Sequence, residues 1–126
     1  MHRCDILIAG GGLAGLIAAV ALTQQGFDVT LIDPGPRPTG ACKDTRSTAY
    51  LRPARDLLGR IGLWDQLAPL ATPLAQLRII DTAGDPPHPV DSRNFLPEGS
   101  GPFGWNLPND ATRAALCQVL ETAPNA

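Results

Sequence analysis

The sequence carries little charge, and the charge it has is nearly balanced. Charged residues make up 17% of the 126 residues, and the formal net charge is −2. No run of like charges occurs along the chain. Proteins whose main partner is a nucleic acid usually show a basic surplus. The charge balance therefore argues against a nucleic-acid partner.

Cysteine and histidine are also scarce. Cys4, Cys42 and Cys117 lie far apart and form no Cys-x-x-Cys pair, which argues against a structural zinc site. We interpret them as reduced thiols of a cytoplasmic protein. His2 and His88 have no Ser, Cys or acidic residue at a recognisable catalytic spacing. The sequence therefore predicts no metal site, and its catalytic residues remain unknown.

The sequence also lacks an uninterrupted apolar run of helical length. Residues 6–22 carry no charge, follow Arg3 and contain Ala19-Val20-Ala21, a passable signal-peptidase site. However, three consecutive glycines at 10–12 divide this segment, and Asp5 directly precedes it. A secretory helix disfavours such glycines, whereas a strand–turn–helix unit uses them. We therefore interpret the segment as part of a folded domain.

Length and composition favour one mixed domain. A chain of 126 residues is near the most frequent domain size, and 44% apolar residues suffice for a packed core. The 13 glycines and 13 prolines are about twice the usual share. Both residues break helices, so an all-helical bundle does not fit this composition.

Residues 1–33 show the pattern of a β-α-β unit. Residues 4–9 form an apolar run of strand length, as in a parallel strand buried on both faces. The next segment has the spacing of a helix that ends at Gly26, with its apolar residues at Leu13, Leu16, Ile17 and Val20. Residues 28–33 are predicted to form a second strand, parallel to the first.

The rest of the chain alternates proline-rich loops with shorter elements. The expected elements are a helix from Ser47 or Thr48 to Gly62, a short helix and turn over 63–73, strands at 77–81 and 103–107, a hairpin return at 90–95, and a final helix capped by Asn109 or Asp110. This order continues the α/β interpretation.

The motif Gly10-x-Gly12-x-x-Gly15 lies between the first strand and the first helix. In a dinucleotide site, Gly10 permits a tight turn, Gly12 lets a pyrophosphate approach the backbone, and Gly15 lets the helix lie close to the strand. The pyrophosphate then meets unpaired amides, here those of Leu13 and Ala14, at the positive end of the helix dipole.

Asp33 ends the second strand, at about the distance where an acidic residue accepts hydrogen bonds from the adenosine ribose hydroxyls. A 2′-phosphate there would face like charge, which disfavours NADP. The glycine spacing alone is a weak signal, but with this strand, helix and acid it predicts a dinucleotide site. The pattern does not distinguish NAD from FAD. A glycine-rich turn with an incidental acid is the alternative.

Three segments resemble known flavoproteins. Residues 8–15 resemble the FAD-binding start of glutathione-reductase-type flavoproteins. Residues 44–51, with Arg46, resemble the D-x-R-x-x-A-L segment of flavoprotein aromatic hydroxylases, and residues 103–120, with Arg113, resemble their later R-x-x-L-x-x-x-L helix. Over essentially its whole length the chain is similar to class A FAD-dependent monooxygenases, nearest to the polyprenyl-phenol hydroxylases of ubiquinone biosynthesis.

This resemblance implies a Rossmann-type, glutathione-reductase-like FAD-binding domain with the start of a small β-rich substrate region. The implied parts are an FAD-binding core at 1–73, the start of the substrate region at 74–107, and a helix at 108–126 that returns to the FAD domain. The resemblance adds Arg46 and Arg113 to the cofactor-binding residues. Relatives often carry a basic pair before the leucines of the last helix, where this chain has Arg113 followed by Ala114.

The resemblance also implies an enzyme that uses FAD, with NAD(P)H as co-substrate. NAD(P)H would reduce the flavin, and one oxygen atom of O2 would pass to the phenolic ring of a small molecule, with or without a polyprenyl chain. A cytoplasmic location is implied, with peripheral association with the inner membrane or a biosynthetic complex as a further option.

Two alternatives remain open. The first is another FAD oxidoreductase of the same fold, such as a halogenase or a prenyl reductase. The second is a truncated, non-catalytic dinucleotide-binding module. Members of the hydroxylase family are several times longer and carry later Asp-Gly and Gly-Asp motifs that are absent here. The chain is therefore expected to be an N-terminal fragment or a truncated gene product, inactive on its own.

Overall fold

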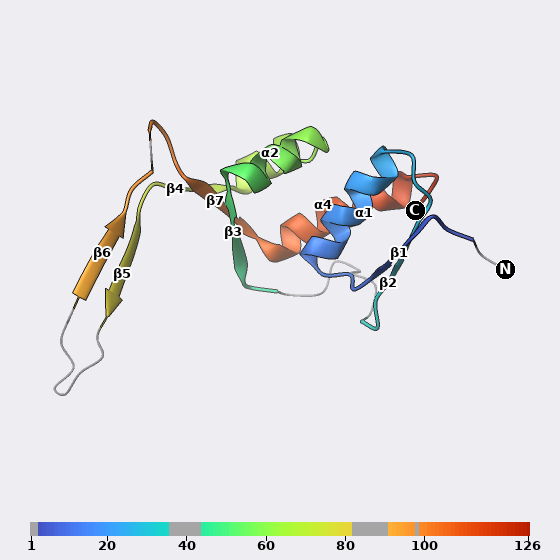
Figure 1. The fold of residues 1–126 in the computed structure, drawn as a ribbon, viewed down its shortest axis with the longest axis horizontal. Helices are drawn as coiled ribbons and strands as arrows, with labels where there is room; N and C mark the ends of the chain where they lie inside the picture. Colours follow the sequence, from blue (N-terminus) through green and yellow to red (C-terminus); the bar gives the residue numbers. More distant parts are fainter. Residues whose placement is uncertain (1–2, 36–43, 82–90, 98) are drawn as a thin grey trace.

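The computed structural model describes residues 3–35, 44–81, 91–97 and 99–126 (Figure 1). Its elements in chain order are β1 (Ile6–Ala9), α1 (Leu13–Gln24), β2 (Val29–Ile32), β3 (Ser47–Leu51), α2 (Arg52–Arg60), α3 (Trp64–Leu67), a 3₁₀ turn (Ala68–Leu70), β4 (Thr72–Leu74), β5 (Leu77–Asp81), β6 (Asp91–Phe95), β7 (Gly104–Pro108) and α4 (Asn109–Thr122). A proline-rich loop is expected at residues 34–38, and its residues 36–38 lie outside the described residues.

The expected β-α-β unit is present. β1 and β2 are parallel, with Ile6 opposite Val29 and Ala9 opposite Ile32. α1 connects them and ends before Gly26, whose φ of +88° is the left-handed conformation that glycine adopts readily. The C-terminal residues close this unit, because the amide of Val29 donates to the carbonyl oxygen of Asn125 at 2.9 Å.

Residues 47–51 are strand β3, so the expectation that a helix begins at Ser47 or Thr48 is wrong. β3 pairs antiparallel with β7, and Thr48 lies opposite Leu107. The helix α2 begins only at Arg52, where Pro53 occupies the first turn. Proline fits there because its missing N–H has no helical partner. The apolar spacing that suggested a helix belongs to the part of the segment that follows β3.

The sheet that contains β3 has a third strand, β4. β4 also pairs antiparallel with β7, which gives a three-stranded sheet in the order β3-β7-β4. β4 begins at the end of segment 63–73, which was expected to be only a short helix and a turn. The short helix itself is present as α3 and the 3₁₀ turn that follows it.

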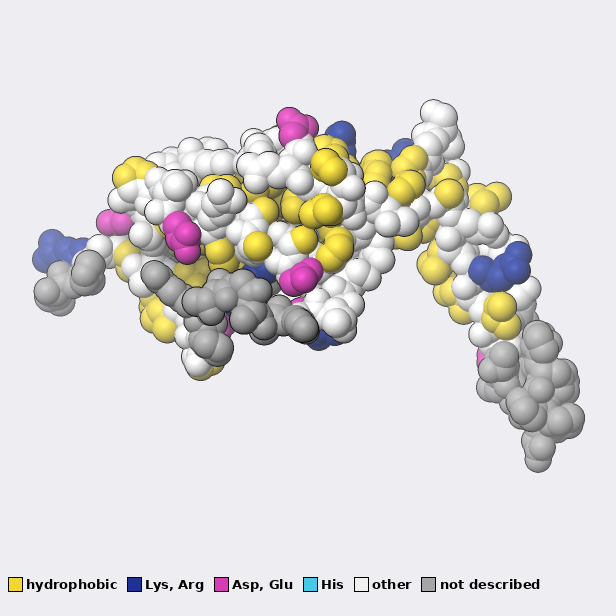
Figure 2. Space-filling model, turned by 180° about the vertical axis from the view of Figure 1, so that it is seen from behind, with side chains coloured by type: hydrophobic (Ala, Val, Ile, Leu, Met, Phe, Trp, Pro, Cys, Tyr) yellow, Lys and Arg dark blue, Asp and Glu magenta, His cyan; other side chains and the backbone are white. Residues whose placement is uncertain are grey.

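The hairpin of β5 and β6 extends away from the rest of the chain (Figure 1). It confirms the strand expected at 77–81 and the return expected at 90–95. Hydrophobic side chains are visible along this arm in Figure 2. Its large exposed hydrophobic residues are Leu77, Ile79, Ile80 and Phe95. A two-stranded ribbon with this much apolar exposure needs a covering surface to be stable.

The expected final helix is present as α4, but it begins at Asn109, and neither Asn109 nor Asp110 caps it. Its N-cap residue is Pro108, and no side chain makes the capping hydrogen bond. The Thr112 hydroxyl instead donates to the carbonyl oxygen of Pro108 at 2.9 Å. The Asn109 side chain bonds outside the helix, as described below.

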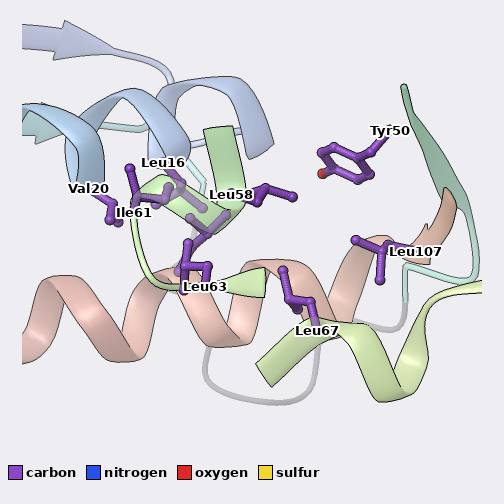
Figure 3. Close-up of a cluster of buried hydrophobic side chains, with 9 residues drawn as sticks. Leu16, Val20, Tyr50, Leu58, Ile61, Leu63, Leu67 and Leu107 are labelled. Carbon is purple, nitrogen blue, oxygen red and sulfur yellow. The ribbon is translucent and has the colours of Figure 1, made fainter. Parts of the chain in front are cut away.

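One hydrophobic core joins the four helices with strands β3 and β7. α1 packs beside α4, and α2 and α3 cover the same side chains (Figures 1 and 3). The buried members of this core are Leu16, Val20, Tyr50, Leu58, Ile61, Leu63, Leu67, Leu107 and Leu116. The other face of the β1–β2 sheet is open, with Leu7 60% and Ile32 54% exposed. In the described part of the chain, no helix has both the length and the apolar character of a membrane span.

Candidate dinucleotide-binding site

The glycine loop connects the end of β1 to the start of α1 by a sharp turn. Gly10 has a φ of +112°, a conformation that side chains rarely allow, and its amide donates to the carbonyl oxygen of Ile32 at 2.8 Å. A Cβ on Gly15 would collide with the carbonyl oxygen of Gly10. Glycine at these two positions therefore lets α1 start directly against β1.

Gly12 has a different role, because the space beside it is open. It is the N-cap residue of α1, its φ of −71° suits any residue, and a Cβ there would meet no atom within 4 Å. No side chain caps α1, and its first turn contains no acidic residue. The first helical amides, including those of Leu13 and Ala14, therefore face an open approach with no side-chain acceptor of their own. Such a helix start attracts anions.

Asp33 lies one residue past β2 and faces the glycine loop. Its Oδ2 accepts the amide N–H of Gly11 at 2.5 Å, and its Oδ1 accepts that of Gly35 at 2.7 Å. These two hydrogen bonds hold the pKa of the Asp33 carboxyl below its usual value, because they favour the charged form. The exposed carboxylate is therefore ionised at neutral pH and fixed beside the loop.

Arg113 comes from α4 and is brought close to this site by the fold. Its guanidinium contributes to the low pKa of Asp33, as a smaller electrostatic effect than the two backbone hydrogen bonds. The residue is half-buried, and its buried Nε has no hydrogen-bond partner among the described residues. A partly buried arginine with such an atom is well suited to a phosphate or another anionic acceptor.

Arg46 lies directly before β3, in a segment separate from the glycine loop. Its Nε and Nη2 donate to the two oxygens of Asp44, both at 2.8 Å, and 81% of its side chain is exposed. The two residues line a pocket of about 280 Å³ at the start of α4, which also includes Ser47, Thr72, Asn106 and Asp110. The structure thus places Asp33 at the glycine loop, within electrostatic reach of Arg113, and places Arg46 beside a separate pocket.

Sequence reasoning missed two features around these sites. The ion pair of Asp44 with Arg46 and the hydrogen bond of Asn109 to Asp44 were not predicted, although the i, i+2 spacing of Asp44 and Arg46 was a visible signal of a local ion pair. The rings of Trp64 and Trp105 meet edge to face, with their centroids 5.4 Å apart. The guanidinium of Arg55 lies over both rings, 5.1 and 5.8 Å from their centroids. Nothing in the spacing indicated this contact.

Comparisons with known proteins agree with this geometry. A family described as the NAD(P)-binding Rossmann-like domain matches residues 8–55. The ubiquinone hydroxylase UbiL of Rhodospirillum rubrum is 34% identical over 97% of this chain, and the 3-demethoxyubiquinol 3-hydroxylase of Escherichia coli is 38% identical over 95% of it. The chain spans only 28% and 31% of the lengths of these two relatives.

A solved structure extends the agreement to three dimensions. The flavin-dependent monooxygenase PieE, determined in complex with FAD and substrate, superposes with a TM-score of 0.71 and 26% identity. The match covers 98% of this chain and 23% of that one. These findings confirm the Rossmann-like fold and the similarity to flavoprotein hydroxylases, and among the curated relatives to ubiquinone hydroxylases. They do not test individual site residues.

Proposed function

We propose that this chain, which is similar to flavin-dependent ubiquinone hydroxylases over nearly its whole length, forms part of the FAD site of such an enzyme. The observation that carries this proposal is the open side of Gly12 at the uncapped start of α1, with the Asp33 carboxylate fixed across the loop. A dinucleotide requires both features, because it presents a pyrophosphate beside a ribose with free hydroxyls.

The residues of the chain fit the adenosine end of FAD. The amides of Leu13 and Ala14 would receive the pyrophosphate, since a helix start favours negative charge. Asp33 would accept the ribose hydroxyls, because each carboxylate oxygen has a second lone pair besides the one used by Gly11 or Gly35. The charge of Arg113 would add to the attraction for phosphate.

The proposed FAD contact of Arg46 concerns another part of the cofactor. Arg46 is anchored to Asp44 at the wall of a pocket, and its planar guanidinium is suited to a fixed acceptor. The ionised Asp33 would repel a 2′-phosphate, so the glycine-loop site is proposed to hold FAD rather than NADP. NAD(P)H would then be a co-substrate that reaches the enzyme elsewhere.

The proposed reaction is the hydroxylation of a phenolic precursor of ubiquinone. A phenol, O2, NAD(P)H and a proton would give a phenol with one additional ring hydroxyl, water and NAD(P)⁺. FAD, when bound, supplies the electron transfer and oxygen activation that this reaction needs. The residues of this chain would bind and orient the cofactor, and none of them is proposed to act as an acid or base.

The division of the chain follows the same proposal. Residues 1–73 would form the FAD-binding core, 74–107 the start of the substrate region, and 108–126 the helix that returns to the core. A polyprenylated substrate would reside in a lipid phase, so a peripheral association with the membrane is part of the proposal.

FAD titration tests this function on the protein produced from its complete reading frame. We expect Gly12→Val to abolish tight binding, because the branched side chain would occupy the open space beside the helix start. Asp33→Ala should weaken binding about tenfold or more, because charge-assisted hydrogen bonds are lost. Gly59→Ala is the matched control, since its Cβ also meets open space but lies in α2.

Oxygen transfer is tested separately, by product analysis with a prenylated phenol, NAD(P)H and O2. Formation of the phenol with one additional ring hydroxyl, with NAD(P)H consumed in equal amount, is the expected result. Tight FAD binding without oxygen transfer to any phenol would instead favour another FAD oxidoreductase of this fold. If Gly12→Val bound FAD like the wild type, the glycine loop would not be the cofactor site.

A further inference from the structure

Asn109 is the first residue of α4, but its side chain does not serve that helix. Its Oδ1 accepts the hydroxyl of Thr48 at 2.6 Å, and its Nδ2 donates to Oδ2 of Asp44 at 3.2 Å. Its backbone N–H donates to the carbonyl oxygen of Arg46 at 3.0 Å. Asn109 therefore connects the start of α4 to three residues in or just before β3.

Asp44 passes this restraint on to the guanidinium of Arg46. Its Oδ1 accepts both Nε and the backbone N–H of Arg46, at 2.8 and 3.1 Å, and its Oδ2 accepts Nη2 as well as the Asn109 amide. An exposed ion pair alone holds a long side chain only loosely. Here, however, the Asp44 carboxylate also accepts a hydrogen bond from Asn109 in α4, so its position does not depend on Arg46 alone.

We propose that Asn109 is a positioning residue for Arg46: by fixing the Asp44 carboxylate, it holds the guanidinium in one orientation at the pocket wall. The bonds to Asp44 engage Nε and Nη2, which leaves Nη1 for an acceptor on the cofactor. An arginine that already has its binding orientation loses less conformational freedom on contact. This inference rests on the proposed function, in which Arg46 contacts FAD.

A double-mutant cycle tests the proposal with the protein from its complete reading frame. FAD dissociation constants are measured for the wild type, Arg46→Ala, Asn109→Ala and the double variant. We expect about a tenfold weakening for Arg46→Ala and about three- to tenfold for Asn109→Ala. The double variant should bind no more weakly than Arg46→Ala, because Asn109 has nothing left to position once the guanidinium is gone.

Two other variants separate positioning from a merely structural role. Thr48→Val removes the bond to Oδ1 of Asn109 but leaves the bond to Asp44, so FAD affinity should stay within about twofold of the wild type. Asn109→Asp keeps the size of the side chain and an acceptor for Thr48, but it places a carboxylate against Asp44. Like-charge repulsion should then displace Asp44 and weaken FAD binding at least as much as Asn109→Ala. This variant also provides the test if Asn109→Ala does not fold.

The possible outcomes separate this inference from the proposed function. Additive losses in the cycle, or wild-type affinity in Asn109→Asp, would overturn the positioning role and leave the FAD site in place. Wild-type affinity in Arg46→Ala would overturn both the Arg46 contact and the positioning role. In that case a loss of FAD binding in Gly12→Val would still support the dinucleotide site at the glycine loop.

Discussion

Replacing Gly15 by alanine sets two known effects against each other. Gly15 lies in the first turn of α1, and alanine is a better helix former than glycine. By propensity alone, Gly15→Ala would stabilise the protein by about 1 kcal/mol. The structure predicts the opposite sign, because the new Cβ would collide with the carbonyl oxygen of Gly10 and would also touch Ile8 Cγ2 at 3.5 Å.

The size of the loss depends on what can move. The colliding group is backbone at a turn with positive φ, not the end of a flexible side chain, so α1 must shift away from β1. Overpacking usually costs about 1–3 kcal/mol, and a rigid neighbour puts the cost near about 3 kcal/mol. After subtracting the gain in helix propensity, we expect a net loss of about 2 kcal/mol in the free energy of unfolding.

Urea denaturation followed by circular dichroism measures this loss, and Gly59→Ala is its matched control. Gly59 lies in helix α2 with no atom within 4 Å of an added Cβ, so the same substitution should stabilise by about 0.5–1 kcal/mol. The two variants should therefore change stability in opposite directions. If Gly15→Ala stabilised the protein as much as Gly59→Ala, the close contact between α1 and the glycine loop would be refuted.

Two further predictions concern the hydrophobic core and the loss of stability at acidic pH. Leu116→Ala should lower the free energy of unfolding by about 2–5 kcal/mol, because the side chain is fully buried. Leu96→Ala, at a site 69% exposed, should change it by less than about 0.5 kcal/mol, and equal losses in urea denaturation would contradict this core. The lowered pKa of Asp33 stabilises the fold above its unfolded pKa of about 4, and this contribution is lost as pH falls through the folded pKa. Wild-type stability measured from pH 6 to 3 should therefore fall more steeply than that of Asp33→Asn, and parallel curves would count against the Gly11 and Gly35 hydrogen bonds.

The segment 47–62 shows where sequence reasoning reaches its limit. The apolar spacing of Ala54, Leu57, Leu58 and Ile61 correctly indicates a helix, and Gly62 follows it with a φ of +71°. The segment's first residues nevertheless form β3, because β7 offers a pairing partner from far along the chain. Periodicity within a segment contains no information about such a partner, so tertiary pairing overrides the local pattern.

Asn109 shows the same limit at the level of one side chain. Asn at the start of a helix usually caps it, which made the capping expectation reasonable. In the structure, Thr48 and Asp44 offer the amide better-placed partners from another element. The choice between a local and a distant hydrogen bond depends on which groups the fold brings within reach.

The β-α-β unit, the glycine turn and the acid at its edge follow from the sequence alone. Their causes are local: a positive φ at Gly10, the close approach at Gly15 and the apolar runs on either side. Tertiary structure decided the electrostatic interaction of Arg113 with Asp33 and the hydrogen bond of Asn109 to Asp44. In each case the residues lie far apart in the sequence, and the packing of α4 against α1 and the pairing of β3 with β7 allow them to interact.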